Sequence, residues 1–331
     1  MPSAVVVGAS GYAGAIAARL LWRHPEFELL AVTAREDAGR PLSELYPHHR
    51  VPLVLEQFDI DRAAEADAAI VAYPHGTAAP VVAALLERDV RVLDLSADFR
   101  LRDLATYERW YVPHPHPELI ARAVYGLTEF YREQIAGATL VACPGCFPTA
   151  AILALAPLAQ DGLIADVVID AKTGVSGAGK QPTDTTHFVA VTENVRPYGV
   201  GGHRHMPEID QELAALGAPV PITFVPHLLP IDQGELLSCY VTATREVSQT
   251  ELEELYARRY AEEPFVELVA RPPGVRDVRE TNLCAISVHA DERTGKLLVF
   301  AAIDNLWKGT ASQAIANLNL MFGFEEGAGL R

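Results

Sequence analysis

The first 145 residues alternate between short apolar runs and longer segments with apolar residues at helical spacing. Segments 15–24 (AIAARLLWRH) and 77–89 (TAAPVVAALLERD) have this helical period. The apolar runs between such segments are expected to be strands, at 4–7, 27–34, 68–73, 91–96 and 139–143. Strands joined through helices form parallel sheets, because the connection has to cross back over the sheet. This half is therefore predicted to be an α/β domain of the Rossmann type.

The pattern changes after residue 145, where apolar and polar positions alternate within each run, as in a half-buried sheet. The runs are 167–174, 222–228, 235–244, 283–290 and 296–304. The last two flank DERTG at 291–295, which suits a hairpin connection. This half is predicted to be an α+β domain with an antiparallel or mixed sheet against helices.

Helix-start signals mark the rest of the second half. Ser248 and Glu251 form a capping box for a helix that runs to about residue 262. Thr310 and Gln313 form a second such pattern before an apolar segment that Gly323 can end. A terminal apolar helix of this kind is expected to pack back on the first domain. The predicted domains are therefore 1–145 with 310–331, and 146–309.

Composition and charge narrow the class of protein. The chain has 331 residues, half of them hydrophobic, which suits two domains with sizeable cores. It lacks any run of about 18 apolar residues, and no basic leader precedes the first strand, so neither a membrane span nor a signal peptide is expected. Four cysteines do not make a disulfide framework, and a reducing cytoplasm is expected. The net charge of −16 argues against nucleic acid but leaves room for small anionic ligands.

Three glycines follow the first predicted strand. Gly8, Gly11 and Gly14 allow a tight turn, the close approach of a pyrophosphate, and close helix–strand packing. The spacing differs from the usual dinucleotide fingerprint, and the alternative is a tight turn that binds no ligand. The position between a strand and a helix favours dinucleotide binding, with Ser10 and Tyr12 part of the same turn.

The end of the second strand bears on the choice of dinucleotide. It reads VTAR, with Thr33 and Arg35 where an acidic residue would bind a free ribose hydroxyl. A hydroxyl and a guanidinium suit a 2′-phosphate, so NADP(H) is favoured over NAD. Glu36 and Asp37 follow closely, which keeps NAD as the alternative.

Cys143 and Cys146, in TLVACPGCFPTAA, allow three interpretations. A structural zinc site needs a second pair of ligands at matching spacing, which the chain does not show, so no metal is predicted. A thioredoxin-like redox pair needs a redox fold, which the predicted domains do not resemble. The third interpretation is a single nucleophile, Cys146, with Cys143 as a small buried residue.

The third interpretation is supported by the segment that follows Cys146. It is expected to be a helix, with Pro148 in its first turn and Gly162 past its end. Cys146 then lies at a helix N-terminus, where unpaired N–H groups and the helix dipole lower a thiol pKa and can stabilise an oxyanion.

A nucleophilic cysteine needs a proton-transfer partner, and the stretch 201–213 (GGHRHMPEIDQEL) supplies candidates. Pro207 suits the first turn of a helix, so His205 stands just outside it and is kept ready to accept a proton. His203 could serve instead, and Glu208 could orient either ring. The alternative is that both histidines are solvent-facing loop residues.

Seven collinear motifs resemble the N-acetyl-γ-glutamyl-phosphate reductase family, which is related in fold to aspartate-semialdehyde dehydrogenase. They are GASGYAG (8–14), PHG (74–76), DLSADFRL (94–101), PGCFPTAA (144–151), TGVSGAGK (173–180), HRHMPEI (203–209) and DNLWKGTA (304–311). The resemblance covers the whole chain. It implies an NADP-binding domain, followed by a domain for catalysis, substrate binding and oligomerisation.

The resemblance also implies a reaction. The Cys146 thiolate attacks an acyl phosphate and expels phosphate, and the resulting thioester is reduced by NADPH to a semialdehyde in arginine biosynthesis. His205 would be the acid or base, supported by His203 and Glu208. GCFPT with VSGAGK points to the arginine branch, and the alternative is the related reductase of lysine biosynthesis.

Further site residues are carried over by motif. The residues expected to contact the cofactor, beyond the glycine turn and the end of the second strand, are Pro74, Ser96, Ser176, Gly177, Asn305 and Lys308. Arg100, Lys180 and Arg204 are expected to bind the anionic substrate, and for each the alternative is an ordinary surface charge. A homodimer or homotetramer is expected. A non-catalytic NADP-binding regulator is disfavoured, because both a nucleophile and a base are present.

Overall fold

The computed structural model describes residues 1–330, and the chain forms two compact units. One comprises Met1–Gly145 together with the C-terminal segment from Thr310, and the other comprises Cys146–Gly309. In the described part of the chain, no helix is long and apolar enough to cross a membrane.

The first unit is built on a six-stranded parallel sheet in the order β2-β1-β3-β4-β6-β5. Its strands are β1 (Ser3–Val7), β2 (Glu28–Thr33), β3 (Ala68–Val71), β4 (Arg91–Asp94), β5 (Val124–Tyr125) and β6 (Leu140–Ala142). The central strand β3 is buried throughout, as expected for a parallel sheet covered on both faces. The predicted α/β fold is confirmed, and the five predicted strands correspond to all of these except the two-residue β5.

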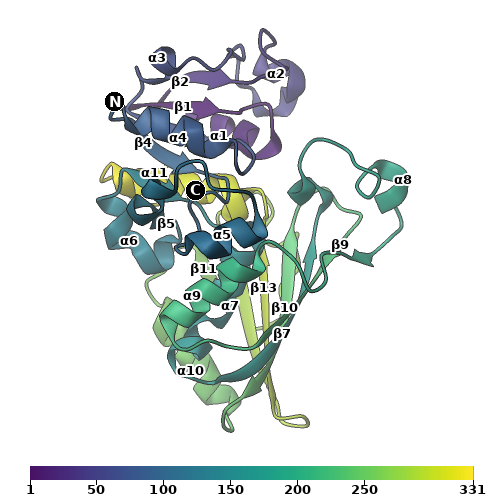
Figure 1. The fold of residues 1–331 in the computed structure, drawn as a ribbon. Coiled ribbons are helices and arrows are strands. Elements are labelled where there is room, and N and C mark those ends of the chain that lie inside the picture. Colours follow the sequence, from purple (N-terminus) through teal and green to yellow (C-terminus); the bar gives the residue numbers. More distant parts are fainter. Residues whose placement is uncertain (331) are drawn as a thin grey trace. The chain divides into compact units, whose positions relative to one another are not determined.

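Helices surround this sheet (Figure 1). They are α1 (Tyr12–Trp22), α2 (Leu42–Leu45), α3 (Ile60–Ala63), α4 (Ala78–Leu86), α5 (Leu104–Trp110), α6 (Thr128–Ala136) and α11 (Ser312–Met321), with short 3₁₀ turns at η1 (Pro47–His49) and η2 (Pro117–Arg122). The predicted return of the terminal helix is confirmed, because Gln313 and Asn317 of α11 both donate to the Gly126 carbonyl, at 2.9 and 2.8 Å.

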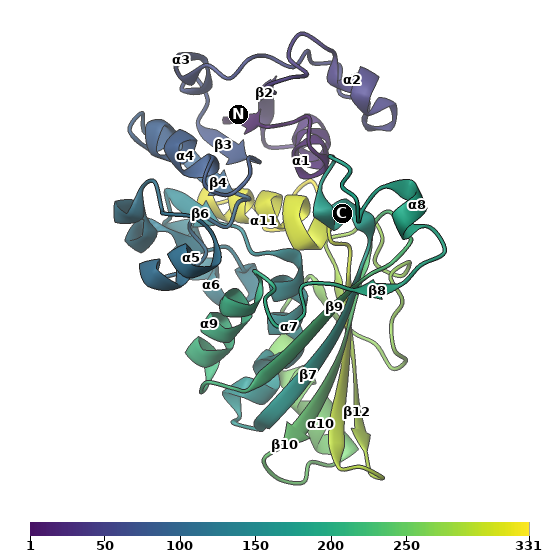
Figure 2. The same cartoon turned by 45° about the vertical axis from the view of Figure 1, so that its right-hand side comes forward.

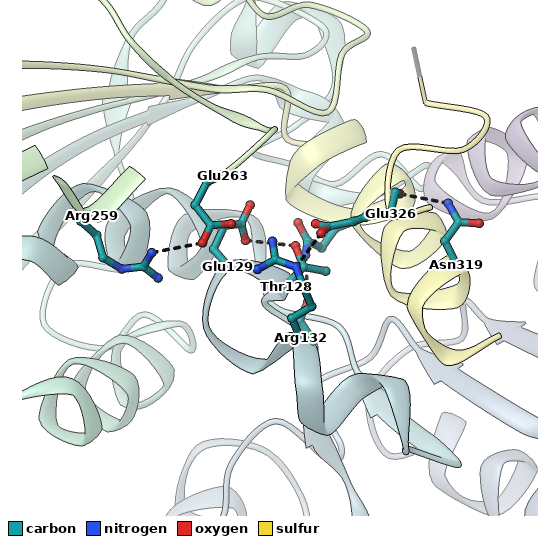
Figure 3. Close-up of polar contacts among 9 residues, drawn as sticks. Thr128, Glu129, Arg132, Arg259, Glu263, Asn319 and Glu326 are labelled. Carbon is teal, nitrogen blue, oxygen red and sulfur yellow. Dashed lines mark hydrogen bonds and ion pairs between the residues drawn. The ribbon is translucent and has the colours of Figure 1, made fainter. Parts of the chain in front are cut away.

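The predicted start of that last helix was wrong. A π-helical turn, η4 (Trp307–Ala311), leads directly into α11, and the N-cap residue is Ala311, which has no capping side chain. Thr310 therefore does not cap the helix, and the Gln313 amide binds Gly126 instead of closing a capping box. The residues after α11 are also held: Arg132 pairs with Glu326 at 2.8 Å, and Asn319 donates to the Glu326 carbonyl (Figure 3).

The second unit is built on a seven-stranded mixed sheet in the order β11-β12-β13-β10-β7-β9-β8. Its strands are β7 (Ile164–Thr173), β8 (Arg196–Pro197), β9 (Ile222–Leu228), β10 (Glu235–Ala243), β11 (Val266–Leu268), β12 (Cys284–Asp291) and β13 (Lys296–Ile303). The five predicted runs correspond to β7, β9, β10, β12 and β13. The predicted hairpin between β12 and β13 is confirmed, with Gly295 at φ +69° in its turn.

Three helices lie along one face of this sheet, as Figure 2 shows. They are α7 (Cys146–Gln160), α9 (Met206–Leu216) and α10 (Gln249–Tyr260), and the short η3 (Val175–Ala178) and α8 (Phe188–Val191) lie in the connection between β7 and β8. The capping box predicted at the start of α10 is confirmed, because the Ser248 hydroxyl accepts a hydrogen bond from the Glu251 amide at 3.2 Å.

Pro157 lies inside α7 and lacks an amide N–H, so the Leu153 carbonyl has no helical donor. The Tyr260 hydroxyl donates to this carbonyl, and the neighbouring Tyr256 hydroxyl donates to the Ala154 carbonyl at 2.5 Å. Two buried tyrosines therefore fasten α10 to α7, the helix that carries Cys146.

Candidate active site

The glycine turn joins β1 to α1 in a tight arrangement. Gly8 has φ +89°, and the amides of Gly8 and Ala9 donate to the Thr33 carbonyl at 3.1 and 2.8 Å. A Cβ on Gly14 would lie 2.4 Å from the Gly8 carbonyl oxygen, so only glycine allows the helix to start this close to the strand. The first amides of α1 have no partner within the helix and can bind an anion.

The other residues predicted at this turn lie around it. The Ser10 carbonyl accepts a hydrogen bond from the Tyr46 hydroxyl at 2.8 Å, and the Tyr12 ring meets Tyr46 edge-on. The Thr33 hydroxyl is buried against the Gly8 amide, at 3.4 Å. Arg35 is exposed just after β2, with its guanidinium 4.6 Å from the centre of the Tyr73 ring. A cation is thus held just after the end of β2.

Pro74 and Ser96 follow β3 and β4 at the carboxyl edge of the sheet. The Pro74 carbonyl accepts from the Thr77 and Ala78 amides at the start of α4, at 3.1 Å each. Ser96 donates its hydroxyl proton to Asp94 at 2.7 Å. Both residues therefore shape the strand ends at the carboxyl edge of the sheet, as expected for a Rossmann fold.

Arg100 is buried next to this serine rather than projecting as a surface charge. Its Nε donates to the Cys143 carbonyl at 2.7 Å and one Nη to the Leu95 carbonyl at 2.8 Å. The guanidinium thus holds the ends of β4 and β6 together. Burial, together with the neighbouring Asp98, raises the pKa of Asp94 to about 7.

The two cysteines of the C-x-x-C motif have different environments. Cys146 is the first residue of α7 and is partly accessible, whereas Cys143 is buried at the end of β6. Burial raises the pKa of the Cys143 thiol to about 12, so this thiol stays protonated. A Cβ on Gly309 would lie 2.7 Å from the Cys146 Cβ, so the η4 turn passes directly against Cys146.

His203 and His205 lie around Phe147, the residue after Cys146. Their ring centres lie 5.5 and 5.9 Å from that of Phe147 and 4.9 Å from each other. Phe224 and Tyr198 complete this aromatic cluster at 5.3 and 5.5 Å from His203. Neither histidine is a freely solvated loop residue.

The two rings differ in what they can do. The His203 Nδ1 accepts a hydrogen bond from the His205 amide at 3.1 Å, which commits this ring to one tautomer. Burial lowers the pKa of His203 to about 4, so its ring is neutral at physiological pH. His205 occupies the N-cap position of α9, as predicted, and Glu208 is buried in the first turn of that helix.

Asn305 ties together the segments after β7 and β13. Its amide donates to the Ser176 hydroxyl at 3.1 Å, and its Oδ1 accepts from the Gly234 amide at 2.7 Å. Gly177 lies beside this bond, with its Cβ position 3.7 Å from the Asn305 amide nitrogen. Lys308 is fully buried in η4, 5.5 Å from the centre of the Phe265 ring.

Comparison with known proteins identifies the family. Residues 3–138 match the semialdehyde dehydrogenase NAD-binding domain, and residues 146–305 match the semialdehyde dehydrogenase dimerisation domain. The chain is 49% identical over 337 residues to N-acetyl-gamma-glutamyl-phosphate reductase of Moorella thermoacetica, an alignment that covers 98% of this chain and 97% of the relative. The chain belongs to the N-acetyl-gamma-glutamyl-phosphate reductase family. It is therefore an oxidoreductase with an NAD(P)-binding domain.

Solved structures extend this fold relationship beyond the reductase family. Aspartate-semialdehyde dehydrogenase II of Vibrio cholerae superposes with a TM-score of 0.76 at 18% identity, covering 98% of this chain and 99% of that one. Aspartate-semialdehyde dehydrogenase of Candida albicans, solved with NADP, gives 0.69 at 14% identity over 97% and 98% of the two chains. The predicted semialdehyde dehydrogenase-like fold is confirmed.

Lys180 and Arg204, the two remaining substrate-binding candidates in this reductase-family chain, are both exposed. They lie on either side of α8, in the long connection between β7 and α9. Among residues 1–330, no group of three or more histidine, cysteine, aspartate or glutamate side chains is arranged to hold a metal ion.

Sequence reasoning missed one residue beside Cys146. Glu235, the first residue of β10, is fully buried and interacts with the Cys146 thiol. The sequence gives no sign of this contact, because Glu235 opens an apolar strand far from the C-x-x-C motif.

Proposed function

We propose that this chain reduces N-acetyl-γ-glutamyl phosphate to N-acetylglutamate semialdehyde and phosphate with NADPH, through a thioester on Cys146. One observation supports it most: the only partly accessible cysteine among residues 1–330 opens a helix, and two histidines pack on the residue beside it. This combination gives an activated nucleophile with a proton carrier at hand.

The residues of the first unit suit NADP(H). The glycine turn and the amides of α1 would receive the pyrophosphate, and Arg35 and Thr33 would receive the 2′-phosphate. Pro74 and Ser96 are proposed to contact the cofactor in this unit, and Ser176, Gly177, Asn305 and Lys308 of the second unit remain candidates for cofactor contact by motif. When bound, NADPH supplies the hydride that reduces the thioester carbonyl.

The residues of the second unit carry the covalent chemistry. The Cys146 thiolate forms a C–S bond to the acyl carbon, and phosphate leaves with the C–O electron pair. The first amides of α7 stabilise the carbonyl oxygen as it gains charge. We assign the proton transfers at this oxygen to His205, since the His203 Nδ1 already accepts a hydrogen bond. Arg100, Lys180 and Arg204 are proposed to bind the anionic groups of the substrate.

The reverse reaction tests the proposal. Supplying N-acetylglutamate semialdehyde, phosphate and NADP should produce NADPH, and Cys146→Ser should abolish this turnover. Cys143→Ser should retain most of it, because this thiol is buried and protonated. Near-normal turnover in Cys146→Ser would refute the thioester route. A semialdehyde one carbon longer, used as competitor, decides whether the chain acts in the arginine or the lysine branch.

The match to a dimerisation domain supports a homo-oligomer, and we propose a dimer or tetramer of the 35.9 kDa chain. Light scattering on the purified protein distinguishes these two states. We propose the cytoplasm as its compartment, because a thiolate nucleophile has to remain reduced.

A further inference from the structure

Glu235 stands on the central part of the second sheet. It pairs with Thr173 of β7 on one side and with Ile303 of β13 on the other. Helix α7 packs against all three strands, and its first residue is Cys146. The Glu235 carboxyl is fully buried and interacts with the Cys146 thiol.

The buried Glu235 carboxyl lacks hydrogen-bond partners that would stabilise its charge. Within the described residues, neither Glu235 oxygen has a hydrogen-bond partner, although the Cys146 thiol and the Thr173 hydroxyl both act to stabilise its charged form. The ionisable groups that act on it are Cys146, Asp304 and Tyr198, and none of them is a cation. A buried carboxylate in such a place is costly, so the group tends to hold a proton.

The pKa of Glu235 shifts upward, as expected for a carboxyl in such surroundings. Burial, followed by the nearby Asp304 charge, raises the pKa of Glu235 to about 8. A thiol at a helix N-terminus shifts the opposite way, toward the thiolate. A carboxyl whose pKa is raised in this way and a thiol at a helix N-terminus can compete for one proton.

We propose that Glu235 is a second catalytic residue at this centre and shares one proton with the Cys146 sulfur. As a carboxylate it accepts the thiol proton, which leaves the thiolate free to form the C–S bond. As a carboxylic acid it returns that proton to sulfur when the thiohemiacetal C–S bond breaks. The hydroxyl proton released in the same collapse goes to His205. The role in turnover rests on the proposed thioester mechanism, whereas the shared proton does not.

The test measures alkylation of Cys146 by iodoacetamide against pH, in the full chain without substrate or cofactor. The other three cysteines are buried, and peptide mapping confirms the modified site. The wild-type rate should rise in two steps, because the pair releases two protons. Glu235→Gln should show one step, and its rate at pH 7 should be no lower than that of the wild type, because the carboxylate that opposes the thiolate charge is gone. Glu212→Gln, at another buried carboxyl of this unit, should keep the wild-type profile.

A wild-type profile in folded Glu235→Gln would overturn the proposal. A single step in the wild-type protein would also overturn it, so the test holds even where the glutamine variant does not fold. Two-step alkylation together with absent reductase turnover would instead refute the proposed function and leave the shared proton standing.

Discussion

At the scale of single residues, environment separates side chains that the sequence makes look equivalent. Cys143 and Cys146 are close in the chain, yet one is a buried strand-end residue and the other opens a helix. His203 and His205 also differ in their surroundings. The half-buried His203 ring accepts a hydrogen bond from the His205 amide, whereas His205 occupies the N-cap position of α9.

The histidines lead to a ranked prediction. His205→Ala should lower kcat by about 10²–10⁴-fold, as expected for the loss of a general acid–base group. His203→Ala should cost less in kcat and more in stability, because it removes a neutral ring from the aromatic cluster. Steady-state kinetics with a thermal melt of each variant checks this ranking. The reverse order in kcat would transfer the acid–base role to His203.

At the scale of elements, the position of α7 decides where the nucleophile lies. Pro157 interrupts the hydrogen bonding of this helix, and α10 compensates for it through Tyr260. The Ala154 carbonyl, which Tyr256 binds, also lies opposite the Leu158 amide of its own helix. The two tyrosines therefore make similar hydrogen bonds, but only the carbonyl bound by Tyr260 lacks a donor within its own helix.

Removing the two hydroxyls should show this difference. Tyr260→Phe leaves a buried carbonyl without a donor and should cost about 1–3 kcal/mol of unfolding free energy. Tyr256→Phe, the matched control, should cost about 1 kcal/mol or less, since the Ala154 carbonyl keeps its helical donor. Urea unfolding of both variants measures the two values. Equal losses would show that Pro157 is not the reason for the Tyr260 contact.

At the scale of the whole molecule, buried carboxyls set how stability depends on pH. The pKa of Asp94 is about 7 in the folded chain and about 3.9 when unfolded, so the folded state holds a proton that the unfolded state releases in this window. Stability contributed at Asp94 is therefore lost as pH rises from about 4 to about 7. Glu235 acts in the same direction.

Asp94→Asn should remove this dependence. Relative to wild type, the variant should gain stability as pH rises from 4 to 8, by at most about 4 kcal/mol. Asp103→Asn should instead run parallel to wild type over this range. Asp103 accepts hydrogen bonds from the Thr106 hydroxyl and, as the cap of α5, from the Thr106 amide, and these bonds lower its pKa. Its contribution is therefore fully present from about pH 5 upward and is lost only in more acidic solution. Thermal melts across this range compare the slopes, and parallel curves for Asp94→Asn and wild type would contradict the prediction.

Much of the fold could be predicted from local patterns, because a strand or helix of sufficient length carries its own period. The strands of both sheets, the capping box at Ser248 and the stop at Gly323 are local features of this kind. The start of α11 was mispredicted because Gln313 binds Gly126, far away in the sequence, rather than its own helix end. The helix after Cys146 was predicted through Pro157 and is observed, but the hydrogen bond that compensates for this proline was not, since it comes from α10.

The sequence by itself determined the class of the protein: a glycine turn between strand and helix, a cysteine before a helix, and a histidine before another are local in the chain. The tertiary structure decided the burial and the hydrogen-bond partners of each of these side chains. Only the packed sheet buries Glu235 against Cys146, directs the Arg100 guanidinium to strand-end carbonyls, and makes the His203 ring neutral. Desolvation and hydrogen-bond partners set these properties, and both depend on residues that the sequence keeps far apart.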